Sequence, residues 1–226
     1  EYYESDPAAD GITARKSGMR RTDDKGRLLL SDEAKVSGDE FFRNSSGEIT
    51  LPLGTAVIRE TKAPEGYLLN GEVLVRQITP SGDGATDTLY QTPEVPEQVI
   101  RGDLQIVKFL GSENDEEDQK TPLEGIVFTV TSKTTGEQIR ITTDENGYAS
   151  TARGDGERGG LVFDTYVVSE TETPEGLEPV GDFEITISEE GSTLYYILEN
   201  REILSPVRLI KTDAETGRTV PLAGTG

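Results

Sequence analysis

The stretch TYVVSETETPEGL, residues 165–177, decides the fold. It begins with β-branched and aromatic residues and ends in Thr-Pro-Glu-Gly, where Pro fixes φ for a turn and Gly supplies a positive φ. A strand that ends in a tight turn is therefore predicted. The same phrase occurs 110 residues earlier as TAVIRETKAPEGY, residues 55–67. This repetition predicts two domains of similar design, each beginning its turn with a glutamate, Glu60 and Glu170.

Short stretches of strand character recur along the whole chain. They are rich in Val, Ile, Thr and Tyr and are bounded by Gly, Pro, Asn or Asp, which is typical of an all-β protein. The region 28–42 departs from this pattern and indicates either a helical turn or an inserted loop. The eight predicted strands cover residues 55–60, 72–78, 103–109, 125–132, 137–143, 165–170, 183–188 and 194–199.

The composition excludes several classes of function. The chain has 226 residues, with 22 Lys and Arg against 43 Asp and Glu, and a net charge of −21. That charge argues against a nucleic acid or an anionic membrane as the partner. The absence of Cys and His removes thiolate chemistry and the commonest general base and zinc ligand, so no enzyme, metal or cofactor is expected.

Targeting signals are also missing from the sequence. No apolar run reaches membrane-spanning length, and the first residues, EYYESDPAAD, lack the basic and apolar regions of a signal peptide. Any segment that exports or anchors the protein is therefore expected outside this sequence.

Further repeated phrases divide the chain. TDDKG at 22–26 parallels TDENG at 143–147, and both predict polar hairpin turns. TPLEG at 121–125 parallels VPLAG at 220–224, and each follows a strand with one lysine, Lys108 or Lys211. We expect a first domain at residues 1–97 that lacks its opening strand, a complete domain at 98–204, and the opening strand of a following domain at 205–226.

Three residues of the complete domain carry chemical interest. Lys108 lies in the first strand, Glu170 at the head of the repeated phrase and Asn200 in the last strand, all among apolar neighbours. Buried charges are costly unless they are paired or neutralised, so these three side chains are expected to meet.

This arrangement resembles a known family. A lysine in the first strand, the YxxxETxxPxG phrase and a C-terminal Asn are similar to the prealbumin-like, CnaB-type repeats of Gram-positive surface adhesins and SpaA-type pilins. The resemblance implies tandem immunoglobulin-like β-sandwich domains. It also implies an intramolecular isopeptide bond, with Lys108 as nucleophile, Asn200 as electrophile and Glu170 as proton shuttle. Burial would favour a neutral amine and a protonated carboxyl that polarises the Asn200 carbonyl.

The first domain matches this pattern less well. Glu60 is present, but no lysine precedes the early strands, and Gln91 stands where Asn200 is expected. Gln is one methylene longer, which would misplace the carbonyl carbon. Joining the end of the chain to its beginning restores the order of motifs. We therefore expect Lys211 to sit beside Glu60 and Gln91 of a neighbouring unit, by strand addition between chains or by continuation in a longer chain.

Other motifs leave alternatives open. Arg-Gly-Asp occurs at 101–103, where it is most simply structural, and at Arg153, Gly154 and Asp155, a Gly-rich loop that could bind a host ligand. The acidic run 112–119 lacks calcium-loop spacing and is expected to be a solvated loop. A carbohydrate-binding accessory module is a further alternative, which an exposed aromatic platform would favour.

The sequence thus favours a structural stalk or fibre building block on the surface or cell wall of a Gram-positive bacterium. Its expected partners are neighbouring copies or domains of the same fibre. The alternatives are an adhesin domain that binds host extracellular matrix and the carbohydrate module.

Overall fold

The computed structural model describes residues 1–8, 11–79, 94–111, 120–154, 156–204 and 215 of the chain. These residues form strands, turns and loops without any helix, so the all-β prediction is confirmed for them. The eight predicted strands all coincide with observed strands. The helical alternative for residues 28–42 is wrong, because that region contains a turn and a short strand. The described part of the chain contains no helix with the length and apolar character needed to span a bilayer.

The chain divides into two compact units, Glu1–Val99 and Ile100–Gly226. Unit 1 contains three small sheets, with strand orders β1-β6-β7, β2-β3 and β4-β5. Its longest strands are the two that the sequence predicted, β6 and β7. The strands are β1 (Tyr2–Tyr3), β2 (Gly18–Arg20), β3 (Lys35–Gly38), β4 (Phe42–Arg43), β5 (Ile49–Thr50), β6 (Gly54–Arg59) and β7 (Val73–Ile78).

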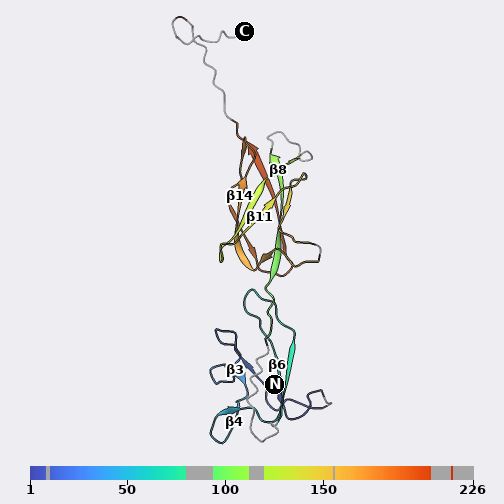
Figure 1. Ribbon diagram of the computed structural model, residues 1–226, viewed down its shortest axis with the longest axis vertical. Helices are drawn as coiled ribbons and strands as arrows, with labels where there is room; N and C mark the ends of the chain where they lie inside the picture. Colours follow the sequence, from blue (N-terminus) through green and yellow to red (C-terminus); the bar gives the residue numbers. More distant parts are fainter. Residues whose placement is uncertain (9–10, 80–93, 112–119, 155, 205–214, 216–226) are drawn as a thin grey trace. The chain divides into compact units, whose positions relative to one another are not determined.

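Unit 2 contains two larger sheets. One has the order β11-β10-β14-β16, and the other has the order β12-β8-β17-β15 with β9 and β13 also paired to β8. Figure 1 shows these strands as two layers. The strands are β8 (Arg101–Gly111), β9 (Thr121–Pro122), β10 (Val127–Ser132), β11 (Gln138–Thr142), β12 (Tyr148–Ser150), β13 (Leu161–Val162), β14 (Asp164–Glu172), β15 (Leu177–Glu178), β16 (Phe183–Ile187) and β17 (Thr193–Glu202).

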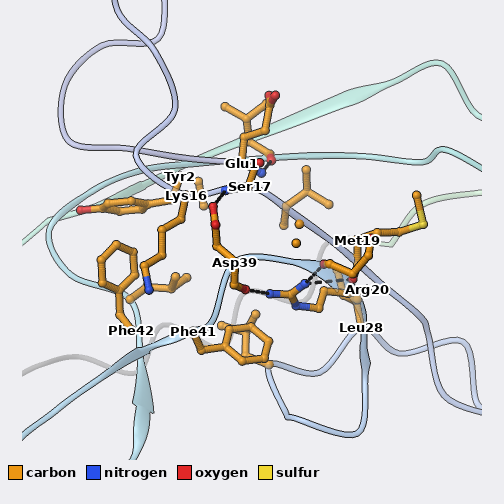
Figure 2. A pocket seen from close by; sticks show the side chains of 18 of the residues that line it. Glu1, Tyr2, Lys16, Ser17, Met19, Arg20, Leu28, Asp39, Phe41 and Phe42 are labelled. Carbon is orange, nitrogen blue, oxygen red and sulfur yellow. Dashed lines mark hydrogen bonds between the residues drawn. The ribbon is translucent and has the colours of Figure 1, made fainter.

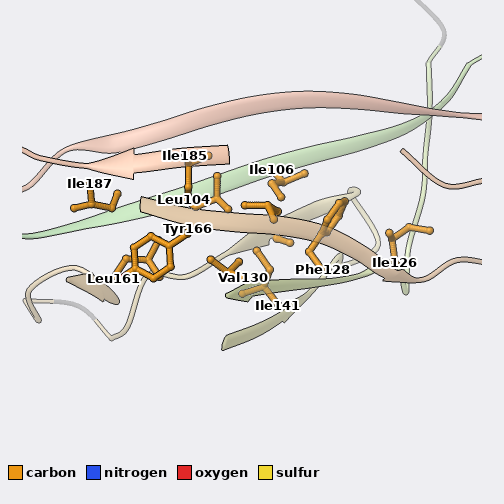
Figure 3. Packing of buried hydrophobic residues seen from close by; sticks show 12 residues of the cluster. Leu104, Ile106, Ile126, Phe128, Val130, Ile141, Leu161, Tyr166, Ile185 and Ile187 are labelled. Carbon is orange, nitrogen blue, oxygen red and sulfur yellow. The ribbon is translucent and has the colours of Figure 1, made fainter. Parts of the chain in front are cut away.

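A single hydrophobic core lies between the two sheets of unit 2. Alternate side chains of β8, β10 and β14 point inward, as the period of a strand requires. Figure 3 shows Leu104 and Ile106 of one sheet packed toward Phe128, Val130 and Tyr166 of the other. Unit 2 is therefore a β-sandwich, as the family resemblance implied.

The first and last strands of unit 2, β8 and β17, are neighbours in the same sheet. They pair in parallel over nine residues, with Leu198 opposite Lys108 and Asn200 opposite Leu110. Because the strands are parallel, the chain enters unit 2 at one end of the sheet and leaves it at the other. A force applied through the chain would therefore shear β17 along β8.

Candidate functional site

Three strands bring Lys108, Glu170 and Asn200 together at one end of the unit 2 core. Lys108 and Asn200 occupy inward positions of β8 and β17, two residues apart in register and on the same face of the sheet. Glu170 is an inward residue of β14, in the facing sheet. The side chains of Lys108 and Glu170 and the whole of Asn200 are 0% exposed.

The Glu170 carboxylate lies between the other two groups. Its Oε2 is 3.0 Å from the Lys108 amine, and its Oε1 accepts a 2.6 Å hydrogen bond from Nδ2 of Asn200. Glu170 is the group that balances the charge of the buried Lys108 amine. Oδ1 of Asn200 is a buried polar atom without a hydrogen-bond partner among the described residues. Such atoms are rare in folded proteins, because each one costs desolvation free energy.

The surroundings shift the ionisation of both charged groups. Burial lowers the pKa of Lys108 below its ordinary value, and the nearby Glu170 opposes this only in part. Burial also raises the pKa of Glu170, but hydrogen bonds from Asn200 and Thr173 outweigh burial and hold that pKa below its ordinary value. The arrangement thus favours a carboxylate beside an amine that gives up its proton more readily than usual.

One hydrogen bond of the site differs from the expected mechanism. The sequence suggested that a protonated Glu170 would polarise the Asn200 carbonyl. Instead, Glu170 faces the amide nitrogen of Asn200, because a carboxylate accepts hydrogen bonds and Nδ2 is the donor of the amide group.

Two of the repeated phrases hold the Lys108 backbone in place. The Lys108 N–H donates to the carbonyl of Gly147, and the Lys108 carbonyl accepts from the N–H of Leu123. Gly147 has φ of 72°, and a Cβ there would lie 2.3 Å from the Lys108 carbonyl oxygen. The sequence identified the 143–147 turn but not this contact. The expectation of a hairpin was wrong, because the turn joins β11 and β12, which lie in different sheets.

The repeated glutamate has a structural role common to both units. Glu170 Oε2 accepts the N–H of Val180 at 3.1 Å, and Glu60 Oε2 accepts the N–H of Asn70 at 2.6 Å. Each carboxylate therefore bridges ten residues across the Pro-Glu-Gly turn. This contact gives the glutamate a role in both turns that does not depend on a lysine. Gln91 and Lys211, the expected partners of Glu60, lie outside the described residues.

The Arg-Gly-Asp motifs differ in their surroundings. Arg153 and Gly154 are exposed between β12 and β13, while Asp155 lies outside the described residues. The motif at 101–103 is part of β8, and Asp103 accepts hydrogen bonds from Thr151 and the N–H of Gly160. The structural interpretation of that first motif is confirmed. The acidic run at 112–119 also lies outside the described residues.

Unit 1 contains a cavity of about 540 Å³ beside β6. Figure 2 shows Lys16 beside Phe42 and Arg20 beside Phe41, and each cation lies 4.3 Å from the ring centroid. Both cations also donate to backbone carbonyls, so they serve the unit's own structure. The remaining lining includes exposed apolar side chains: Met19, Leu28, Leu30 and Ile58.

Comparison with known proteins identifies the class of unit 2. Residues 110–202 match the family model of the SpaA prealbumin-like fold domain. The resemblance inferred from the lysine, the glutamate phrase and the C-terminal Asn is thereby confirmed for this domain. No curated protein sequence matches the chain.

Among solved structures, the chain is similar to the Bacillus anthracis TIE protein, with a TM-score of 0.52 and 20% identity over 88% of this chain and 33% of that one. The chain therefore spans about a third of that protein. The minor pilin GBS52 of Streptococcus agalactiae has a TM-score of 0.39 and 19% identity, over 79% of this chain and 74% of that one. The SpaA shaft pilin of Lactobacillus rhamnosus GG has a TM-score of 0.35 and 18% identity, over 53% of this chain and 57% of that one. At these identities the likeness to the TIE protein concerns the fold alone.

Proposed function

We propose that this chain is a structural building block of a stalk or pilus-like fibre, stabilised by an isopeptide bond between Lys108 and Asn200. The observation that carries the proposal is the buried group of three side chains, in which Glu170 contacts both the Lys108 amine and the Asn200 amide. An ion pair alone would keep a charged amine buried, whereas an amide bond between Lys108 and Asn200 removes that amine and keeps Oδ1 as the carbonyl oxygen of the new bond.

The carboxylate of Glu170 can act as the proton shuttle. Lys108 passes a proton to Oε2, and the neutral amine attacks Cγ of Asn200 to form the new C–N bond. The carboxyl group returns that proton to Nδ2, which is 2.6 Å from Oε1, and then takes the second proton of the amine. The Cγ–Nδ2 bond breaks and ammonia leaves, and the Glu170 carboxyl group passes the second proton to this ammonia. The net products are one amide and one ammonium ion. Glu170 ends unchanged, and the reaction occurs once per molecule, as maturation rather than enzymatic turnover.

The bond would have a mechanical consequence. It would join β8 and β17 near the end where the chain leaves unit 2. A force between the two ends of the chain would then pass through residues 101–108, the bond and residues 200–202. Residues 109–199 would carry no load, and the shear of β17 along β8 would be blocked by a covalent bond.

The match to a SpaA prealbumin-like domain supports a place on the surface or cell wall of a Gram-positive bacterium. The partners would be neighbouring units of the same fibre, and host matrix is a further candidate through the exposed Arg153 loop. We also propose that units join by strand complementation, with Lys211 beside Glu60 and Gln91 of the neighbour.

A pair of matched variants tests the role of Glu170. In Glu170→Ala, the intact mass should equal that of the unmodified sequence, because no group remains to move protons between Lys108 and Asn200. Glu60→Ala removes the equivalent carboxylate of unit 1. Its intact mass should be one ammonia below the mass calculated from the sequence of that variant. Loss of ammonia in Glu170→Ala would exclude Glu170 from the mechanism.

A further inference from the structure

One edge of the sheet that contains β17 is open within unit 2. On one side, β17 pairs with β8 from Thr193 to Arg201. On its other side it pairs only with the short strand β15, which lies opposite Arg201 and Glu202. In the part of the chain that the structure describes, residues 193–200 therefore have no strand beside them on that side.

The backbone groups of this edge alternate between β8 and the open side. The N–H of Asp103 in β8 donates to the carbonyl of Ser192, and the parallel register then continues without a shift to Arg201. In such a ladder, residues of one parity bond to the neighbouring strand and the others point away from it. The N–H and C=O groups of the odd-numbered residues, from 195 to 199, therefore face the open side and can pair with a further strand.

The outward side chains of the edge are apolar. Tyr195 is 72% exposed and Ile197 is 70% exposed, although both lie in a long strand of the sandwich. Val107 of β8 lies opposite Ile197 on one side and opposite Tyr148 of β12 on the other. An apolar strip thus crosses the outer face of the sheet and ends at its open edge.

The facing sheet of unit 2 has edges of a different kind. Its two outer strands are β11 and β16. β11 presents the exposed Arg140 and β16 presents the exposed Glu184. Charged side chains on an edge strand oppose its pairing with another chain. Residues 193–198 of β17 include no charged residue, so that stretch lacks this protection.

The sequence of the open edge is nearly symmetric about Tyr196, because residues 194–198 read LYYIL. In an antiparallel pairing of two copies centred on Tyr196, Leu194 lies opposite Leu198 and Tyr195 lies opposite Ile197 of the second copy. Apolar side chains then meet on both faces, including two aromatic–β-branched pairs, which stabilise a sheet. The same register sets the outward backbone groups of residues 195 and 197 against each other, as a hydrogen-bonded antiparallel pair requires. The edge is therefore complementary to itself.

The pairing also fits at its ends. Thr193 would lie opposite Glu199 of the second copy, and β15 begins only opposite Arg201, so residues 193–199 can pair without displacing β15. Glu199 forms a 2.6 Å ion pair with Lys120 of its own chain. The acidic residue at each end of the seam is thus already balanced by a cation, although the whole chain has a net charge of −21.

We infer that unit 2 binds a second copy of itself edge to edge, through antiparallel pairing of residues 193–199 of the two β17 strands. Two sheets then become one continuous sheet, and Tyr195 of each copy packs against Ile197 of the other. The contact is a two-fold one, in which both chains use the same surface. It goes beyond the proposed fibre role, since it needs neither the Lys108–Asn200 bond nor any residue of unit 1.

Sedimentation of the full chain over a range of concentrations tests the association. The apparent mass should rise from that of one chain to that of two. Ile197→Lys should raise the concentration of half-association by roughly tenfold or more, since each dimer loses two Tyr195–Ile197 pairs and gains charge at the seam. Gln138→Lys, the matched control, places the same charge on the exposed edge of β11 and should change nothing. Equal shifts in the two variants, or a chain that stays monomeric up to about 1 mM, would overturn the inference.

Disulfide formation between two single variants tests the register, because the chain has no cysteine of its own. Tyr195→Cys and Ile197→Cys chains are mixed in equal amounts and oxidised. Disulfides between unlike chains should clearly exceed about one half of the total, the share expected from random pairing, because positions 195 and 197 lie directly opposite each other only in this register. A share near one half, or a preference for like chains, would overturn the register.

Hydrogen exchange of the unsubstituted chain gives an independent measurement. As protein concentration rises, the amides of residues 195, 197 and 199 should become more protected, whereas those of residues 194, 196 and 198, which already bond to β8, should not change. Protection that is independent of concentration would overturn the edge pairing. The intact mass reports the Lys108–Asn200 bond separately, so failure of that bond is distinguishable from failure of the pairing.

Discussion

Replacing Asn200 with Ala should remove the stability that the proposed isopeptide bond adds to unit 2. The proposed bond closes a loop of about 90 residues, from 108 to 200. By the chain-entropy relation for a crosslink, closing a loop of this size stabilises the folded state by about 4 to 5 kcal/mol. For a domain of about 100 residues, each kcal/mol shifts Tm by about 4–8 °C, so the unit 2 transition should fall by roughly 20–30 °C.

A matched variant separates the crosslink from the lost hydrogen bond. Thr173 donates a 2.7 Å hydrogen bond to the same Glu170 oxygen that Asn200 contacts. Thr173→Val should therefore cost about 1.5–3 kcal/mol, as for a hydrogen bond to a charged group, and leave the crosslink intact. Calorimetry of both variants, with the unit 1 transition as an internal reference, gives the comparison. Equal decreases in Tm for Asn200→Ala and Thr173→Val would refute the reasoning.

Two further predictions follow from the contacts around Lys108. Gly147→Ala should destabilise unit 2 by more than Gly26→Ala destabilises unit 1, because both glycines have positive φ but only Gly147 lies against the Lys108 carbonyl. Denaturant unfolding of each unit measures the two losses of stability. Equal losses would argue against a role of this turn in placing β8. In the uncrosslinked Asn200→Ala chain, burial lowers the pKa of Lys108, so the unfolded state binds more protons than the folded state between that lowered pKa and the ordinary value. Stability should therefore rise with pH through this window, and adding Lys108→Met should abolish the rise; a rise of the same size without Lys108 would assign it to other groups.

The strands were predictable because their local patterns are long enough to be specific. The eight stretches of Val, Ile, Thr and Tyr correspond to the longer strands, from β6 to β17. Two-residue strands such as β4 and β5 carry no such signal, since their pairing depends on the tertiary contacts of unit 1. The region 28–42 has neither the period of a helix nor that of a strand, and its three leucines lie outside the observed strands.

The site was predictable only in part. The order of Lys108, Glu170 and Asn200 indicated which side chains to examine, because buried ionisable groups need partners. The sequence could not give the orientation of the Asn200 amide, which depends on the hydrogen bonds that Glu170 accepts from Thr173 and Val180. It also gave no sign that Gly147 holds the lysine backbone, since that contact joins segments 39 residues apart.

The most direct test of the account is mass spectrometry of the intact chain followed by peptide mapping. We predict a mass one ammonia below that of the unmodified sequence, and after digestion a branched peptide that joins the segments containing Lys108 and Asn200. An unmodified intact mass, with Lys108 and Asn200 recovered in separate linear peptides, would contradict the isopeptide bond.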